Sequence, residues 1–343
     1  MPDSLQYPFS DAPDPGSLIE VAPGIHWLRM PLPFALNHIN LWLLEDADGW
    51  TLVDTGIGTE EVKGIWETLI AGPLSGQPIK RIIVTHFHPD HLGLAGWLSR
   101  RFDAPVLMTQ LEYEQAVRLH DTSGNSRTEQ QQRFFSSHGL GQTEVEEQSS
   151  SINVYRSRVP ELPRGYQQLK DQDQIRIGSN CWQVIVGRGH SPEHMCLYCP
   201  ELDVLIAGDQ MLPTISPNIS VTFMNPDSDP LSDYLASLKD LAKLPSSVKV
   251  LPAHGLVFYG LHQRVAALAE HHQDRLNLLL DACEKPKCAA DVLSVLFNRT
   301  FGPHELFFAM GEAVAHLHHL VEDGLIQRQQ DSQGVIRFLR MPI

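Results

Sequence analysis

The chain has 343 residues, of which 42% are hydrophobic and 20% are charged, so it can form one large packed domain with a small appendage. Its formal net charge of −15 disfavours broad electrostatic affinity for nucleic acid or for an anionic membrane. No apolar run approaches the roughly 20 residues that span a bilayer, and the first residues are polar and proline-rich without a secretory pattern. We therefore expect a cytoplasmic protein with no membrane span.

The first half of the sequence predicts strands and helices in alternation. Strand patterns occur in five segments, which are 24–32, 39–46, 48–56, 79–86 and 104–109. Helical patterns occur at 61–70 and 92–102. From about 111 to 164 the polarity rises and the strand rhythm ends, which we interpret as a helical insertion with a mobile middle. It is either a lid over a functional site or a surface excursion without a role.

The second half returns to strands and ends in helices. Residues 173–190 predict a hairpin, and further strands are expected at 203–210 and 248–255. A long helix is predicted over 261–283, and a break at 285–287 separates it from a tail. Cys196 and Cys199 form a C-x-x-C, but a strand would place their side chains on opposite faces, so we expect two ordinary thiols.

The stretch "VTHFHPDH", residues 84–91, places three histidines and one aspartate on a turn directly after a predicted strand. His190, Asp209 and His254 stand at the ends of three later strands. Strand ends meet at one edge of the sheets in an α/β fold, so we expect these side chains to gather in one polar site. Imidazoles and carboxylates bind zinc, iron or manganese, and about six or seven such ligands would hold two metal ions.

Four motifs, "HFHPDH", "GHSPEH", "AGDQ" and "AHG", follow one another in this chain. This order resembles that of the metallo-β-lactamase superfamily, whose pattern is H-x-H-x-D-H, G-H-[ST]-x-x-H, G-D and [GA]-H-G. The resemblance covers about residues 20–260. It implies an α/β fold, an αββα sandwich with the site at one edge of its two sheets. We therefore expect an N-terminal extension over 1–19, a metallo-β-lactamase domain over 20–260 and a connecting helix over 261–283.

The resemblance also assigns roles to individual residues. One metal ion would be bound by His86, His88 and His190, a second by Asp90, His91 and His254, and Asp209 would bridge them. Asp54 and His194 would support these ligands by hydrogen bonds rather than bind metal. Relatives often have Gly at the position of Glu193, so the backbone of that turn is expected to differ locally. We expect two divalent ions, zinc first, although iron or manganese would be accepted by the same ligands.

Two divalent ions make water a nucleophile near neutral pH, so hydrolysis is the expected chemistry. Asp90 is the expected catalytic residue, which orients the nucleophile and takes up or passes on its proton. The same ligands serve thioesterases, lactonases, β-lactamases and nucleases. We favour a small-molecule acyl substrate, a thioester, ester or lactone, because the acidic charge fits it. Phe134, Phe135 and Tyr155 of the insertion could also cover an acyl chain.

Two alternatives remain open. An endoribonuclease or phosphodiesterase would need a basic path to the metal ions, for which the scattered candidates are Arg100, Arg101, Arg156, Arg158 and Arg164. A non-hydrolytic role, as a mono-iron persulfide dioxygenase or a binding module, is disfavoured because all seven ligands are retained. Histidine rather than glutamate at position 88 argues against the flavodiiron branch. The tail also lacks a motif that matches the basic glutathione site of glyoxalase II.

The tail over 284–343 predicts three helices and a two-stranded wing that turns at "DSQG". It is similar to the winged-helix C-terminal domain of a superfamily branch that includes glyoxalase II-like and endoribonuclease-like members. Six Lys or Arg stand against seven Asp or Glu, which favours packing or a homodimer over binding in a DNA groove. His316, His318 and His319 cannot all converge on one metal from a helix, so we expect them at the surface or in an interface.

Overall fold

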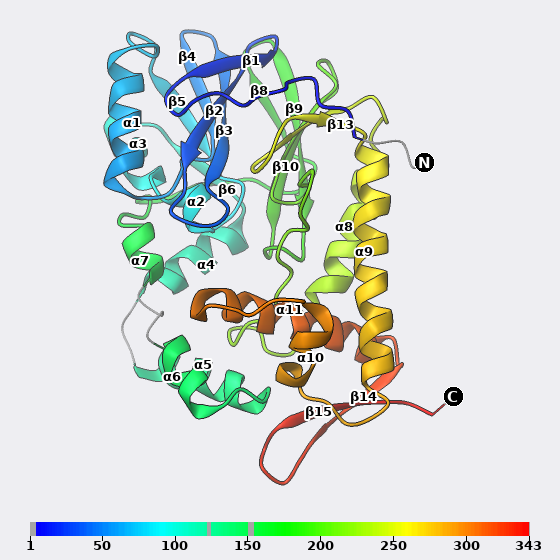
Figure 1. Cartoon of the computed structure of the whole chain (residues 1–343). Coiled ribbons are helices and arrows are strands. Elements are labelled where there is room, and N and C mark those ends of the chain that lie inside the picture. Colours follow the sequence, from blue (N-terminus) through cyan, green and yellow to red (C-terminus); the bar gives the residue numbers. More distant parts are fainter. Residues whose placement is uncertain (1–4, 122–124, 150–153, 343) are drawn as a thin grey trace. The chain divides into compact units, whose positions relative to one another are not determined.

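The structure is a computed structural model that describes residues 5–121, 125–149 and 154–342. The chain divides into two compact units (Figure 1). Unit 1 comprises Met1–Thr122, Val154–Pro217 and Asp240–Val265, and unit 2 comprises Ser123–Asn153, Asn218–Lys239 and Ala266–Ile343. Two helices, α8 (Pro230–Leu241) and α9 (Leu261–Ala282), each have residues in both units.

The first sheet of unit 1 has seven strands in sequence order. They are β1 (Leu18–Ala22), β2 (Ile25–Pro31), β3 (His38–Asp46), β4 (Gly49–Val53), β5 (Ile79–Ile83), β6 (Val106–Met108) and β7 (Gln167–Gln168). Strands β1 to β4 pair antiparallel, and β4 to β7 pair in parallel. The parallel part brings the carboxyl ends of β4 and β5 to the same edge, so Asp54 and the turn with His86 lie side by side.

The second sheet of unit 1 has six strands in the order β13-β12-β11-β10-β9-β8. They are β8 (Gln174–Ile177), β9 (Asn180–Gly187), β10 (His194–Cys199), β11 (Val204–Gly208), β12 (Lys249–Pro252) and β13 (Phe258–Tyr259). Strands β11 and β12 are parallel and the other pairs are antiparallel. The predicted hairpin over 173–190 is therefore confirmed as β8 and β9. Cys196 and Cys199 are buried free thiols in β10.

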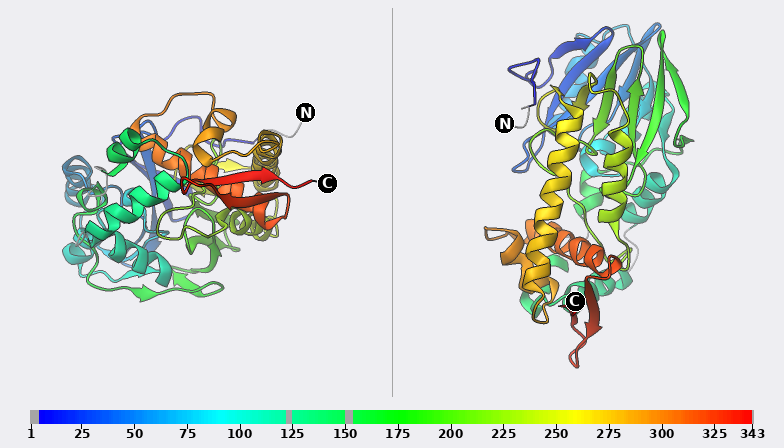
Figure 2. Two further views of the ribbon diagram at one scale, coloured as in Figure 1. Left: turned by 90° about the horizontal axis from the view of Figure 1, so that it is seen from below. Right: turned by 90° about the vertical axis from the view of Figure 1, so that its right-hand side faces the viewer.

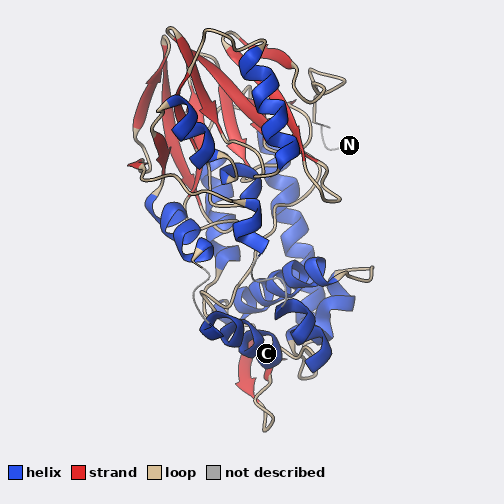
Figure 3. Ribbon diagram, turned by 90° about the vertical axis from the view of Figure 1, so that its left-hand side faces the viewer, coloured by secondary structure: helices blue, strands red, loops and turns tan. Residues whose placement is uncertain are grey.

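The two sheets pack face to face around one apolar core. Trp27 and Trp42 of the first sheet belong to the same buried cluster as Trp182 and Leu197 of the second. Helices cover the outer face of the first sheet, where α1 (Glu60–Ala71) packs on β2 and α3 (Ala95–Phe102) packs on β5 (Figure 3). This burial on both faces explains why β3 is almost continuously apolar instead of alternating. The predicted α/β sandwich is confirmed.

Unit 2 contains the middle of the expected insertion together with the tail. Its elements are α5 (Asn125–Ser137), α6 (Gln142–Ser149), most of α8 and α9, α10 (Ala289–Leu296), α11 (Pro303–Glu322), β14 (Ile326–Gln330) and β15 (Ile336–Arg340). The hairpin β14–β15 follows α11 directly and is red in both views of Figure 2. Phe134 and Phe135 are buried in this unit, and the ring of Phe135 contacts that of Phe307.

Unit 2 corrects two expectations. The tail has two helices over residues 284–342 rather than three, because the chain between α10 and α11 is irregular and α11 is a single helix of 20 residues. His316 and His318 are buried and His319 is partly buried, so a place at the surface was wrong. Helix α11 contacts α6, α10 and β14. These neighbours bury several faces of the helix, including faces whose histidines its own sequence pattern does not mark as buried. The winged-helix assignment stays a prediction.

The expected mobile middle of the insertion falls partly on residues 122–124 and 150–153, which lie outside the described residues. The two ends of the insertion, α4 (Gln110–His120) and α7 (Val154–Arg158), belong to unit 1. No helix in the described part of the chain is both long and apolar enough to cross a bilayer.

Candidate metal centre

The turn that carries the histidine-rich motif begins where β5 ends. Short helix α2 (Pro89–Leu92) starts with proline, whose fixed φ suits the first position of a helix. His88 precedes this helix in an extended conformation, with φ −61° and ψ 148°, whereas Asp90 and His91 lie on its first turn. The change from extended to helical backbone therefore sends the side chains of one short motif in different directions.

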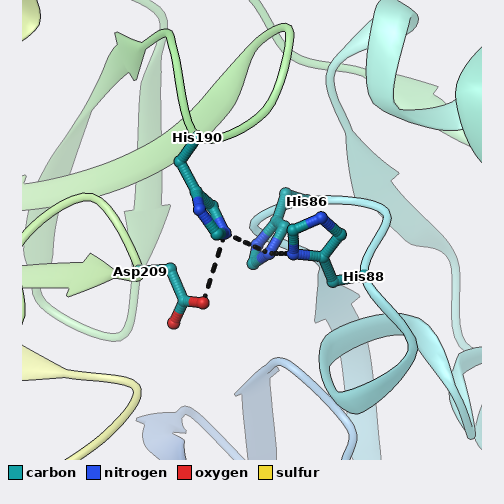
Figure 4. Close-up of side chains that lie close together, drawn as sticks. All are labelled: His86, His88, His190 and Asp209. Carbon is teal, nitrogen blue, oxygen red and sulfur yellow. Dashed lines mark hydrogen bonds and ion pairs between the residues drawn. The ribbon is translucent and has the colours of Figure 1, made fainter. Parts of the chain in front are cut away.

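Four side chains from three separate segments form a first group. His86 Nε2 lies 2.8 Å from His88 Nδ1 and 3.3 Å from His190 Nε2, and His190 Nε2 lies 3.3 Å from Asp209 Oδ2 (Figure 4). One ligand atom from each residue lies within 4.8 Å of the others, so the four can hold a metal ion.

Asp90, His91 and His254 form a second group with the same spacing. The Asp90 Oδ2 atom lies 3.4 Å from His254 Nε2 and 3.6 Å from His91 Nε2. Asp209 also faces this group, because its Oδ1 atom lies 3.3 Å from His254 Nε2 and 3.6 Å from His91 Nε2. The two oxygens of Asp209 thus face different groups, and the structure brings together all seven side chains that the sequence singled out.

The rings of this centre are fixed by hydrogen bonds at the nitrogens that face away from it. His91 Nδ1 donates to Asp54 Oδ2 at 2.7 Å, and His254 Nδ1 donates to the carbonyl oxygen of His38 at 2.7 Å. With Nδ1 engaged in these hydrogen bonds, Nε2 of each ring is the nitrogen that faces the carboxylates of the centre. His194 Nε2 in turn accepts from the backbone N–H of Asp209 at 3.0 Å. Asp54 and His194 therefore contact the predicted ligands, as expected, and lie outside both groups.

Burial and charge act differently on the histidines of the two groups. Burial lowers the pKa of His86 well below its usual value and that of His88 to about 3, so both rings are neutral, the form that binds metal. Burial also acts to lower the pKa of His254, but Asp209 and Asp90 overcome it and raise the pKa to about 10. The second group thus presents carboxylates that attract positive charge.

Two buried polar atoms in the centre lack a hydrogen-bond partner in the described part of the chain, His91 Nε2 and Asp209 Oδ1. Unpartnered buried polar atoms are costly, and both of these atoms are of the type that coordinates divalent cations. The donor set and the unpartnered atoms therefore fit divalent metal binding.

Glu112 of α4 joins the two loops of the first group, and sequence reasoning missed it. Its buried carboxylate accepts from Phe87 N at 3.0 Å, from Ser191 Oγ at 2.6 Å and from Glu193 N at 2.7 Å. Burial raises the pKa of Glu112 to about 7, although these hydrogen bonds oppose the shift. Phe87 lies between two predicted ligands and Ser191 follows a third, so Glu112 fixes both ligand segments relative to each other.

Glu193, the departure from the superfamily pattern, is also hydrogen-bonded to α4 and to Thr109, the residue before α4. Its side chain accepts from Leu111 N at 3.1 Å, and its carbonyl oxygen accepts from Thr109 Oγ1 at 2.8 Å. The side chain and the carbonyl oxygen of Glu193 thus tie this turn to the start of α4.

Two further residues that were not singled out hold the "AHG" loop. Arg29 donates to the carbonyl oxygen of Gly255 at 2.8 Å, and His38 Nε2 accepts from Gly255 N at 2.8 Å. Local sequence patterns could not reveal these roles of Arg29 and His38, because each contact with Gly255 joins residues more than 200 positions apart.

Comparison with known proteins agrees with this geometry. Residues 36–254 match the family model of the metallo-beta-lactamase superfamily, and residues 276–341 match the model of a metallo-beta-lactamase-like C-terminal domain. The chain therefore belongs to the metallo-β-lactamase superfamily, a class of metallo-hydrolases.

Similar proteins cover most of the chain. A beta-lactamase domain protein from Burkholderia ambifaria has a crystal structure that is 40% identical, with a TM-score of 0.91 over 98% of both chains. A metallo-beta-lactamase family protein from Thermus thermophilus is 31% identical, with a TM-score of 0.80 over 94% of this chain and 100% of that one. "Probable metallo-hydrolase YqjP" of Bacillus subtilis is 26% identical over 84% of this chain and 90% of its own length.

One more distant relative carries the name of a reaction. An atrochrysone carboxyl ACP thioesterase of Aspergillus fumigatus is 23% identical over 68% of this chain, which spans 41% of that enzyme.

Proposed function

We propose that this protein hydrolyses an acyl bond, in a thioester, ester or lactone, with two divalent cations, zinc first. His86, His88 and His190 would hold one cation, Asp90, His91 and His254 the other, and Asp209 would bridge them. Cations held there supply Lewis acidity, which makes water a nucleophile near neutral pH and polarises a carbonyl oxygen. The observation that carries this proposal is Asp209, whose two carboxylate oxygens face the two groups.

The chain's own residues have separate tasks in this proposal. Burial acts to raise the pKa of Asp90, but His91 and His254 beside it lower the pKa to about 2, so the carboxylate is ionised and can hold the nucleophile by a hydrogen bond. Asp90 would then take up the proton that the nucleophile releases and pass it to the leaving group. Asp54 and His194 would keep the ligand rings and the Asp209 loop in place.

An acyl substrate is favoured over RNA for two reasons. The chain carries a net charge of −15, which opposes a polyanion. The relative whose name gives a reaction is a thioesterase, although the similarity is distant.

The test is metal analysis of the purified protein together with hydrolysis of an acyl thioester, a lactone and a single-stranded RNA. We expect about two metal ions per chain and acyl cleavage that His88→Ala abolishes. His262→Ala is the matched control, because this exposed histidine lies outside both groups and bonds the carbonyl oxygen of Leu244. Metal-dependent RNA cleavage with inert acyl substrates would overturn the acyl assignment, and a fully metallated protein that cleaves none of the three would overturn hydrolysis of these classes.

A further inference from the structure

We propose that Arg158 and Phe34 form a subsite beside the metal centre that binds an anionic oxygen group of the substrate, a carboxylate or a phosphate. This inference rests on the proposed acyl hydrolase function and specifies which acyl substrates the protein prefers.

Helix α7, which ends at Arg158, is attached at one point to the ligand turn and at another to the loop between β4 and α1. Tyr155 Oη donates to the carbonyl oxygen of Phe87 at 2.6 Å, and Gly58 N donates to the carbonyl oxygen of Arg158 at 2.8 Å. Helix α7 also packs against α2, which carries Asp90. A Cβ atom at Gly58 would lie only 2.6 Å from the carbonyl oxygen of Arg158, so these backbones are in close contact. The position of Arg158 is therefore set by the loop after β4, and the helix that carries it is also bonded to the turn of the predicted ligands.

The Arg158 side chain lies over an aromatic ring near the second group of ligands. Its guanidinium carbon is 4.4 Å from the ring centroid of Phe34. Phe34 lies in the loop before β3, and the first residue of β3, His38, fixes the ring of His254. Burial lowers the pKa of Arg158, and the charge of Asp90 opposes this shift, so the guanidinium is partly desolvated and within electrostatic reach of Asp90.

This arrangement suits recognition of an anion. Stacking on Phe34 engages the face of the guanidinium, whereas its N–H groups lie in the plane and match two oxygens of a carboxylate or phosphate. Partial burial strengthens such a contact because fewer waters compete for it. The ring of Phe34 also offers apolar surface to the carbon chain that carries the anion.

A purely structural role makes a different prediction. If Arg158 served only to balance the charge of Asp90, its loss would affect charged and neutral substrates alike. The experiment therefore compares two thioesters of one small thiol, N-acetylcysteamine, with acyl chains of equal length. The glutaryl ester carries a terminal carboxylate and the pentanoyl ester does not.

For the zinc-loaded full chain we expect Arg158→Gln to raise KM for the glutaryl ester by about 10- to 100-fold, the effect of one charge-assisted contact. The pentanoyl ester should change by less than about twofold on the same reasoning. Arg158→Lys should recover part of the loss, because it keeps the charge without the planar fork. Arg156→Gln, an exposed arginine of the same helix, is the matched control and should resemble the wild type. Equal losses for both esters would overturn the subsite, and so would the absence of any loss both with these esters and with an ester of a phosphorylated thiol.

Two further measurements complete the test. Pentanoyl esters of pantetheine and of its 4′-phosphate locate the anion, since an effect of Arg158→Gln confined to the phosphorylated thiol would place it on the leaving group. Calorimetric binding of glutarate against pentanoate needs no turnover. Arg158-dependent glutarate binding in a protein that cleaves no ester would retain the subsite and reject the proposed hydrolase. A protein that cleaves the esters, but whose choice of ester and whose binding of glutarate do not change in Arg158→Gln, would retain the proposed hydrolase and reject the subsite.

Discussion

Replacing Glu112 with glutamine tests how the two loops of the first ligand group are held. A glutamine keeps the shape of the side chain, but its NH2 group cannot accept a hydrogen bond. One side of the side chain would then face a backbone N–H, either that of Phe87 or that of Glu193, without an acceptor. An unsatisfied buried N–H costs about 1–3 kcal/mol, and above pH 7, where the Glu112 carboxylate is ionised, the lost contact to a charged acceptor costs about as much again.

We therefore expect Glu112→Gln to lower the free energy of unfolding by about 2–6 kcal/mol. The affinity for zinc should fall by about 10- to 100-fold, the usual effect of losing a group that orients metal ligands. Urea unfolding measures the first quantity, and competition with a chromophoric chelator measures the second. Glu114→Gln is the matched control, because this exposed residue of the same helix bonds only the side chain of Gln110 among the hydrogen bonds described. Wild-type stability and zinc affinity in Glu112→Gln would refute this reasoning.

Three further predictions concern other parts of the chain. Asp54→Asn places an NH2 group where either His91 Nδ1 or a backbone N–H now finds an acceptor. The affinity for zinc should therefore fall by about 10- to 100-fold in the same chelator assay. An unchanged affinity would show that the Asp54 carboxylate does not orient the His91 ring. Gly58→Ala should destabilise the protein by about 1–3 kcal/mol, because a Cβ atom there would clash with neighbouring backbone atoms. Gly64→Ala should stabilise it by about 0.5–1 kcal/mol, because Gly64 lies inside α1 with open space around its Cβ position. Thermal melts that show the same sign of change for both variants would contradict this. Burial lowers the pKa of His138 from 6.5 to about 4, so between these two pH values the unfolded chain binds more protons than the folded one. The stability that the neutral, buried His138 contributes is therefore complete above pH 6.5 and is lost as the pH falls toward 4. The loss amounts to at most about 1.4 kcal/mol per pH unit. Urea unfolding of His138→Gln across that range should show a shallower pH dependence than the wild type, and equal slopes would count against the burial argument.

The strands and the seven side chains of the centre could be predicted because both leave local signals, whereas the sandwich was implied by the resemblance to the superfamily. Apolar runs that end in His or Asp mark strands and their carboxyl ends, and the parallel pairs β4–β5 and β11–β12 bring these ends to one edge. The motif at 86–91 is short enough that its spacing alone defines a turn.

The supporting contacts could not be predicted in this way. Glu112 reads as an ordinary polar residue of an amphipathic helix, and its partner Ser191 is 79 positions away. His38 contributes a backbone oxygen as well as a ring, and a backbone oxygen has no sequence signature. The burial of His316 was missed for a related reason, since one helix's spacing shows its own faces and not how many neighbours it has.

The path of the chain through α4 and α7 has a consequence for how this protein can diversify. The predicted metal ligands follow strands of the sandwich, whereas Glu112 and Arg158 belong to the two ends of one inserted segment whose middle folds with unit 2. With Arg158 in the role proposed above, mutations in α7 would alter which substrates bind while the predicted metal ligands on the strands stay unchanged. Such separation would let a lineage explore new substrates without losing its metal centre.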